Sequence, residues 1–314
     1  MMTTAVLSIN QEQFQEARKQ GIGSSEIGTL LGVNDYMTPY QLWLVKTGRE
    51  KEFEGNKYTI AGHRLEGAVA EYFEDETGNV VIKESAPDIT YYHPMHHFAL
   101  ATPDREYVLN DLSRGILECK TTQKSIDPEF PPETWFCQLQ WQLGILNSQD
   151  GAAYEEGSTA WLFRGLDFHC VHFEYDAAFF QYLLDKAGRF WEKHVLQDTP
   201  PPAKTGEDIQ RAFPKHFSGK VVKATEELRN DYQRLIEVRA QKKVLELEEE
   251  QIKERMKLIM RDAEAISYYE ETLVTWRASK PSRKFQKNAF ETDHPELYQA
   301  YVEEVPGSRR FLVK

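Results

Sequence analysis

Two short segments hold the residues whose types and spacing are best suited to chemistry: residues 101–104 (ATPD) and residues 115–120 (GILECK). The second segment is expected to be a strand, and side chains alternate between the two faces of a strand. Glu118 and Lys120 therefore emerge side by side on one face. Asp104, at the end of the first segment, arrives beside them. The pattern brings together two carboxylates and an ammonium group, although an ordinary exposed strand pair would have the same sequence.

These groups predict metal-assisted hydrolysis of a phosphodiester bond. The carboxylates of Asp104 and Glu118 and the backbone carbonyl of Cys119 form an oxygen-only set suited to Mg²⁺ or Mn²⁺. Lys120 would orient a water nucleophile and stabilise negative charge that develops on phosphorus. Glu66, on a helix expected before the strands, offers a further carboxylate for a second metal or its water ligands. A solvated helix glutamate is the alternative interpretation of Glu66.

A glycine- and serine-rich turn at residues 21–25 (GIGSS) is suited to bind a phosphate. Its backbone N–H groups lie at an expected helix start, and Arg18 lies just upstream. The turn lacks the Lys-Ser/Thr pair of a nucleotide-binding P-loop, which argues against a nucleoside triphosphate. Ser25 would otherwise serve only as a helix N-cap. Gln138 and Gln142, one helical turn apart, either face the same cleft or form a polar helix edge.

The elements that must position these residues belong to a mixed α/β domain. Helices are expected at about 62–77, after the prolines at 131–132 and around 176–197, and strands at 80–82, 97–102, 114–121, 160–163 and 169–173. Apolar residues at helical spacing support the first helix, and Gly78 supplies its C-terminal cap.

Three consecutive prolines at 200–202 cannot continue a helix or donate to a sheet, so a domain boundary is predicted at residue 203. Residues 1–203 hold 16 Lys and Arg against 30 Asp and Glu, a net charge of −14, whereas residues 204–314 hold 22 against 20 and carry +2. The net charge of the whole chain, −12, argues against a protein that coats a polyanion. It fits a protein that captures rare ends through a specific phosphate site.

The second part, residues 204–314, is predicted to be a helical extension with a basic, β-rich tail. A long helix is expected at about 225–262 because apolar residues fall on two columns of sevens, Leu228, Leu235 and Met256 on one, and Val238, Leu245, Ile252 and Ile259 on the other. Lys242 and Glu249 interrupt the first column, which favours packing against its own chain or a partner over a free coiled coil. Short strands are expected at 273–277 and 309–313.

The cysteines and the N-terminus point to the cytoplasm. The three cysteines are widely spaced and in no CxxC motif, so a disulfide framework and a four-cysteine metal site are excluded. The N-terminus lacks a basic flank followed by an apolar segment. No stretch approaches the ~18 uninterrupted apolar residues of a membrane span, and no membrane association is expected.

Five blocks within residues 10–195 resemble, in order and approximate spacing, the phage lambda exonuclease / YqaJ viral recombinase family of the PD-(D/E)XK nuclease superfamily. The blocks are Arg18-x6-Ser25-Glu26, Gly62-x3-Glu66, Thr102-Pro103-Asp104, Leu117-Glu118-Cys119-Lys120 and Gln138-x-Gln140. Each block alone is a weak signal, but the set of five is specific. The resemblance implies a restriction-endonuclease-like core, with a mixed sheet flanked by helices, and a Mg²⁺-dependent exonuclease. Such an enzyme degrades linear double-stranded DNA from the 5′ end and leaves a 3′ single strand for a recombinase.

The resemblance also implies roles for individual residues. Asp104 and Glu118 match the family's metal ligands, Glu66 the glutamate that completes the acidic cluster, and Lys120 the catalytic lysine. A second group, Arg18, Ser25, Thr102 and Gln138, matches the residues that hold the 5′-phosphate. The family further implies a ring-shaped homotrimer that threads DNA, a phage or prophage origin and a single-strand annealing recombinase as partner.

Two other functions fit the same residues. The metal cluster alone does not distinguish entry at an end from internal cutting, so a structure-selective endonuclease of the same superfamily is one alternative. A non-catalytic DNA-binding scaffold, whose helical C-terminal part recruits an annealing protein, is the other. The intact set of Asp104, Glu118 and Lys120 argues against a loss of catalysis.

Overall fold

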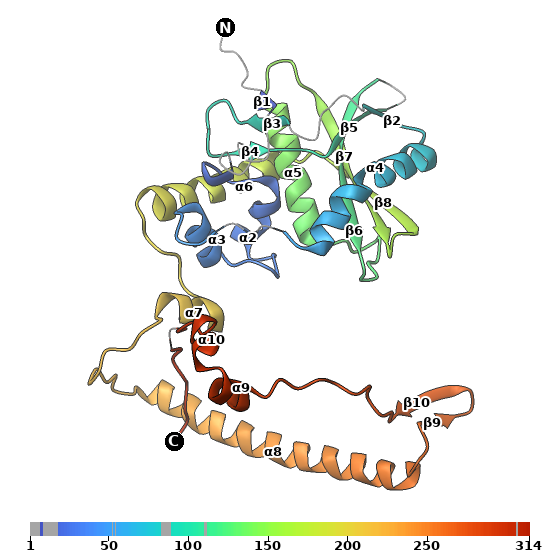
Figure 1. Ribbon diagram of the computed structural model, residues 1–314. Coiled ribbons are helices and arrows are strands. Elements are labelled where there is room, and N and C mark those ends of the chain that lie inside the picture. The colour runs from blue at the N-terminus through green and yellow to red at the C-terminus, as the bar shows by residue number, and fades with distance from the viewer. Residues whose placement is uncertain are drawn as a thin grey trace. The chain divides into compact units, whose positions relative to one another are not determined.

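The chain forms two compact units, Met1–Pro214 and Lys215–Lys314 (Figure 1). The computed structural model describes residues 7–8, 18–51, 53, 55–82, 89–109, 112–305 and 307–314. None of the helices in these ranges combines the length and the apolar character that crossing a membrane requires.

A five-stranded mixed sheet forms the centre of the first unit. Its strands, in spatial order, are β2 (Val80–Ile82), β5 (Arg105–Val108), β6 (Arg114–Thr122), β7 (Tyr154–Phe163) and β8 (Asp167–Glu174). Strands β6 and β7 are parallel, and the other neighbouring pairs are antiparallel. A parallel pair needs a crossover, which α5 (Glu133–Asn147) supplies after the two prolines. A smaller sheet holds β1 (Leu7–Ser8), β3 (Ile89–Tyr92) and β4 (Leu100–Ala101).

Helices cover both faces of the large sheet, which confirms the predicted mixed α/β class. On one face, α4 (Lys57–Thr77) packs Val69 and Phe73 against Leu117 of β6. Gly78 ends α4 in the left-handed conformation that the sequence predicts. On the other face, Ile116 of β6 joins the core beneath α5. Side chains of β6 therefore alternate between the two layers as the sequence predicts.

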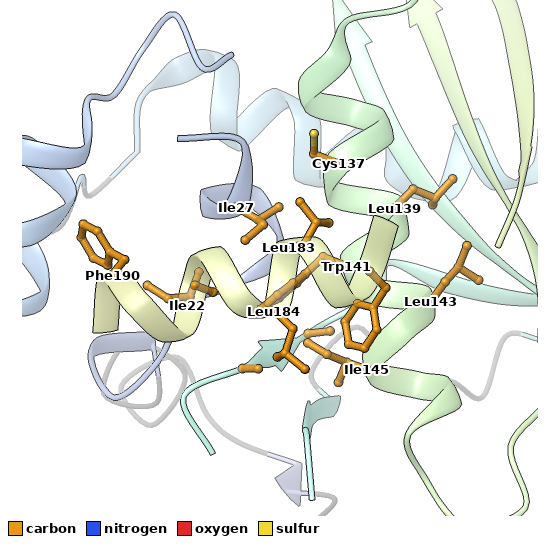
Figure 2. Close-up of a cluster of buried hydrophobic side chains, with 14 of the residues drawn as sticks. Ile22, Ile27, Cys137, Leu139, Trp141, Leu143, Ile145, Leu183, Leu184 and Phe190 are labelled. Carbon is orange, nitrogen blue, oxygen red and sulfur yellow. The ribbon is translucent and has the colours of Figure 1, made fainter. Parts of the chain in front are cut away.

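The larger core lies on the α5 side, among several short helices. These are η1 (Ser24–Glu26), α2 (Ile27–Leu31), α3 (Pro39–Lys46), α6 (Ala177–Phe190) and the π-helical segment Trp191–Leu196 that continues α6. Figure 2 shows Ile27 of α2 beside Leu183 of α6, in a core cluster that also contains Leu184 of α6 and Trp141 of α5. This core holds the N-terminal turn around Ile22 against the helix that follows β6.

The first unit extends beyond the predicted boundary at residue 203, because α7 (Gly206–Ala212) contacts α3 and its flanks. Thr38 donates its hydroxyl to the buried Asp208 carboxylate at 2.9 Å. Arg211 forms an ion pair of 2.7 Å with Glu50. The prolines at 200–202 are thus a rigid connection inside the first unit.

The second unit consists of a long helix, a hairpin and two short helices. They are α8 (Glu226–Met260), β9 (Ala265–Tyr268) paired antiparallel with β10 (Glu271–Thr275), α9 (Lys287–Asp293) and α10 (Pro295–Ala300). The helix matches the expected range 225–262, and among the described residues it buries only Met260. The strand expected at 309–313 is absent there because these residues pair with no neighbouring strand, whereas β10 pairs with β9.

Candidate active site

Strand β6 presents two charged side chains on the face that α5 covers. Lys120 donates from Nζ to Glu118 Oε1 at 2.6 Å. Glu118 is buried, with 4% of its surface exposed, and Lys120 is partly open to solvent. Burial alone would lower the pKa of Lys120, but the carboxylates of Glu118 and Asp104 outweigh it and hold that pKa above its ordinary value of 10.5. Lys120 is therefore a cation at neutral pH.

The turn into β5 brings Asp104 to this pair. Strands β5 and β6 are antiparallel with Arg105 opposite Leu117, which places Asp104 beside the backbone of Cys119. The Cys119 N–H donates to Asp104 Oδ2 at 2.8 Å. Burial and the neighbouring Glu118 carboxylate raise the pKa of Asp104 well above its ordinary value of 3.8. Asp104, Glu118 and Lys120 thus form one cluster, as the sequence predicts.

Two glutamines of α5 turn toward the same carboxylate. Gln138 donates from Nε2 to Glu118 Oε1 at 2.6 Å, and its own Oε1 accepts from Lys120 at 3.0 Å. Gln142 donates from Nε2 to Glu118 Oε2 at 2.8 Å. Both glutamines therefore turn toward Glu118 and are buried, so they do not form an exposed polar edge of the helix.

Glu66 lies on α4 and pairs with His63, whose Nδ1 is 2.7 Å from Glu66 Oε1. Its charge contributes to the raised pKa of Asp104, so the two carboxyl groups are electrostatic neighbours. Within the described ranges, however, no three His, Cys, Asp or Glu side chains converge on a point that a metal ion could occupy. Metal ligation by Glu66 stays a prediction.

The donors present fit a hard divalent cation. Asp104 and Glu118 supply carboxylate oxygens, and Cys119 a backbone carbonyl, the ligand types that Mg²⁺ and Mn²⁺ prefer. Burial and the neighbouring Glu118 carboxylate together raise the pKa of Asp104, and a bound cation would offset both effects. Such a site leaves coordination positions for water and phosphate oxygens.

A small pocket lies beside this cluster. It is lined by all four residues predicted to hold a phosphate, together with three neighbours: Arg18, Ser25, Thr102 and Gln138, with Gly23, Ser24 and Leu100. The turn at residues 21–25 reaches this place because Ile22 pairs with Ala99 next to β4. A side chain at Gly21 would meet the carbonyl oxygen of Phe98 at 2.5 Å, so the close approach requires glycine.

A buried ion-pair network supports the pocket. It includes Lys46, which no motif in the sequence indicates. Glu26 forms ion pairs with Lys46 at 2.7 Å and with Arg18 at 3.3 Å. It also accepts from the Gly23 N–H at 2.8 Å, which fixes the turn. Burial raises the pKa of Glu26, but the charges of Lys46 and Arg18 outweigh burial and hold that pKa below its ordinary 4.5. Lys46 lies on α3, far from any motif in the sequence, so its sequence context carried no signal of this contact.

Glu26→Gln is expected to lower the free energy of unfolding at pH 7 by about 3 kcal/mol, because it leaves the buried Lys46 ammonium without its carboxylate. Since the folded-state pKa of Glu26 is depressed, this stabilisation is present above pH 4.5 and is lost as the pH falls further. Urea denaturation at pH 7 and below pH 4 measures both effects. Glu207→Gln, on the exposed Arg211 pair, is the matched control and should cost less than about 1 kcal/mol. Equal stability of Glu26→Gln and the wild type at pH 7 would contradict the assigned role.

The fold and the cluster define an α/β domain with a carboxylate–lysine centre beside a small pocket that Arg18 lines. Residues 13–149 match the YqaJ-like viral recombinase domain. This match spans all five blocks of sequence and confirms the resemblance that they predict.

One relative is similar along nearly the whole chain, and solved structures are similar over about 60% of it. The Uncharacterized protein YqaJ of Bacillus subtilis (strain 168) is 28% identical over 324 residues, covering 98% of this chain and 97% of the relative. Among solved structures, the alkaline exonuclease LHK-Exo from Laribacter hongkongensis covers 60% of this chain and 94% of its own, with 17% identity and a TM-score of 0.46. A phage related exonuclease from Haemophilus somnus 129PT covers 59% and 100%, with 10% identity and a TM-score of 0.42.

Proposed function

We propose that the protein is a metal-dependent exonuclease that hydrolyses linear double-stranded DNA from its 5′ end. The observation that carries this proposal is the position of Gln138. Its side chain lines the pocket with Arg18 and also contacts both Glu118 and Lys120. A phosphate site and a hydrolytic cluster that share one residue suit an enzyme that holds a terminal phosphate while it cleaves nearby.

In the hydrolytic cluster, some residues would bind the metal and another would stabilise negative charge. Asp104, Glu118 and the Cys119 carbonyl would hold the metal, which supplies a Lewis acid and lowers the pKa of water when bound. Lys120, a cation at neutral pH, would donate hydrogen bonds to the attacking water or to phosphate oxygens. It would serve as an electrostatic stabiliser, because the carboxylates of Glu118 and Asp104 favour its charged form.

The pocket would select the end of the strand. A terminal phosphate monoester carries more negative charge than an internal diester, so the Arg18 guanidinium favours it. The hydroxyls of Ser25 and Thr102 and the amide of Gln138 add hydrogen bonds around the same space. Thr102 lies 3.0 Å from the hydroxyl of Thr90, which restrains its orientation. Capture of a 5′-phosphate in this pocket would set the 5′-to-3′ polarity.

The direct test is the time course of digestion of a linear duplex labelled at one 5′ end, with Mg²⁺ or with chelator. The proposal expects early release of the 5′ label with Mg²⁺, no release with chelator and an untouched covalently closed circle. Cutting of the circle would favour the structure-selective endonuclease instead. Absence of any Mg²⁺-dependent or Mn²⁺-dependent digestion would contradict the enzyme and favour the binding scaffold.

Arg18→Ala is expected to reduce the rate on 5′-phosphorylated ends by about 10- to 100-fold, the value of one charged hydrogen bond. The rate on 5′-hydroxyl ends should change little, because these ends lack the group that Arg18 binds. Parallel digestions of the two substrates give the ratio. Lys19→Ala, the exposed neighbour, is the control and should keep the wild-type ratio. An unchanged preference in Arg18→Ala would reject the assigned role.

Several further features of the proposal are still predictions. The description of the matched family, a viral recombinase domain, supports a role in which the 3′ single strand passes to a single-strand annealing recombinase. The exposed apolar residues of the second column of α8, Val238, Leu245, Ile252 and Ile259, would suit docking of such a partner. A ring-shaped homotrimer, the use of Mg²⁺ or Mn²⁺ and action in the cytoplasm stay predictions as well.

A further inference from the structure

Glu118 is held at both carboxylate oxygens by side chains of α5. Gln138 contacts Oε1 and Gln142 contacts Oε2, each through its amide Nε2. The two glutamines are one helical turn apart, so a single rigid helix presents both donors. A carboxylate that accepts a directed hydrogen bond at each oxygen has a fixed plane.

The two glutamines differ in what else they touch. Gln138 also contacts Lys120 and lines the phosphate pocket, so its loss would disturb several parts of the site at once. Gln142 is fully buried and lies outside the lining of that pocket. Any influence of Gln142 on the chemistry must therefore pass through Glu118.

A comparison within α5 shows that Gln142, unlike Gln140, uses only one end of its amide. Gln140, equally buried, satisfies both ends of its amide: Nε2 donates to the Glu174 carbonyl at 2.7 Å, and Oε1 accepts from the Asp176 N–H at 2.8 Å. Gln142 Oε1 is buried with no hydrogen-bond partner among the described residues. A buried acceptor without a partner costs free energy, which an apolar residue of the same shape would avoid. The one hydrogen bond that the Gln142 amide makes is the bond from Nε2 to the Glu118 carboxylate.

We propose that Gln142 is a positioning residue that fixes the orientation of the Glu118 carboxylate for the divalent cation. The proposal rests on the proposed function, because it takes Glu118 as a metal ligand. Residues that hold a metal's ligands typically change metal affinity by about 10- to 100-fold when they are replaced. Loss of the Gln142 donor should therefore weaken the binding of the metal itself.

The test measures Mn²⁺ binding to the full chain by electron paramagnetic resonance, without DNA, for three variants. Gln142→Met keeps the volume and removes the donor, and it should raise the Mn²⁺ Kd by about tenfold. Gln140→Met removes two hydrogen bonds from the same helix and should lower the melting temperature, but it should leave the Mn²⁺ Kd within about twofold, since Gln140 does not contact Glu118. Glu118→Gln defines which bound Mn²⁺ belongs to this site.

The outcomes separate the inference from the function on which it rests. If Glu118→Gln abolishes Mn²⁺ binding but Gln142→Met binds like the wild type, the role of Gln142 is wrong and the proposed metal site stands. If the wild type and Glu118→Gln bind Mn²⁺ equally, the metal site of the proposed function fails and the inference fails with it. Should Gln142→Met not fold, Gln142→Asn repeats the test, because its shorter amide keeps polarity but does not reach Oε2. Weakened binding in that variant supports the inference, and wild-type binding overturns it.

Discussion

Asp104→Asn is expected to lower Mg²⁺-dependent digestion of linear duplex by about 10³-fold, equivalent to about 4 kcal/mol of transition-state stabilisation. The substitution removes one of the two carboxylates of the cluster while it keeps an oxygen that can accept from the Cys119 N–H. It also removes an ionisable carboxyl group whose pKa is raised by desolvation and by the neighbouring Glu118 carboxylate. The thermal stability of the metal-free variant should therefore equal or exceed that of the wild type. Initial rates and melting curves on the same preparations measure both effects.

The combination of lost activity and retained stability separates a catalytic role from a structural one. Asp150→Asn, an exposed aspartate in the turn before β7, is the matched control and should change neither quantity. A variant of Asp104 that digests duplex at the wild-type rate would show that the cluster is not the hydrolytic centre. A large fall in melting temperature would show instead that the carboxylate stabilises the fold.

Lys120→Met should reduce the rate of cleavage by about 10²- to 10⁴-fold, the range that positioned electrostatic or proton-transferring groups contribute. Methionine keeps the unbranched stem of the side chain but has no ammonium group. Glu118 retains its two glutamine donors, so the carboxylate stays in place. Binding of Mn²⁺ should persist or become tighter, because a positive charge leaves the site. Single-turnover rates and Mn²⁺ titrations together distinguish loss of chemistry from loss of metal.

Lys124→Met, on the exposed turn that follows β6, is the control for removal of a lysine close in sequence. It should cleave at the wild-type rate. If Lys120→Met lost Mn²⁺ binding together with activity, Lys120 would serve to organise the carboxylates and the proposed electrostatic role would be wrong. A rate unchanged from the wild type would remove Lys120 from the mechanism altogether.

Local periodicity and spacing were sufficient to predict much of the first unit. The alternation along β6 follows from the geometry of any strand, so the common direction of Glu118 and Lys120 needed no knowledge of their neighbours. The end of α4 at Gly78 and the start of α5 after the prolines are local signals of the same kind. Strand β5 was not predicted, because its first two residues, Arg105 and Glu106, are charged and leave only a short apolar run.

Contacts between distant segments could not be predicted in the same way. The strand expected at 309–313 does not form, because a segment with β propensity becomes a strand only where it can pair with a second strand. The boundary expected at residue 203 falls later because a buried aspartate, Asp208, ties α7 to the first unit. Lys46 reaches Glu26 only through the packing of α3 against the N-terminal turn. Each of these outcomes depends on a partner far away in the chain.

The sequence by itself determined which chemical groups the protein has and in which direction neighbouring ones point, because bond geometry within one element is local. It predicted Asp104, Glu118 and Lys120 as a cluster and Arg18 with residues 21–25 as a phosphate site. Only the tertiary structure decided that Gln138 belongs to both, because that depends on which face α5 turns toward the sheet. Helix packing is set by the summed burial of many side chains and not by the spacing within any one motif.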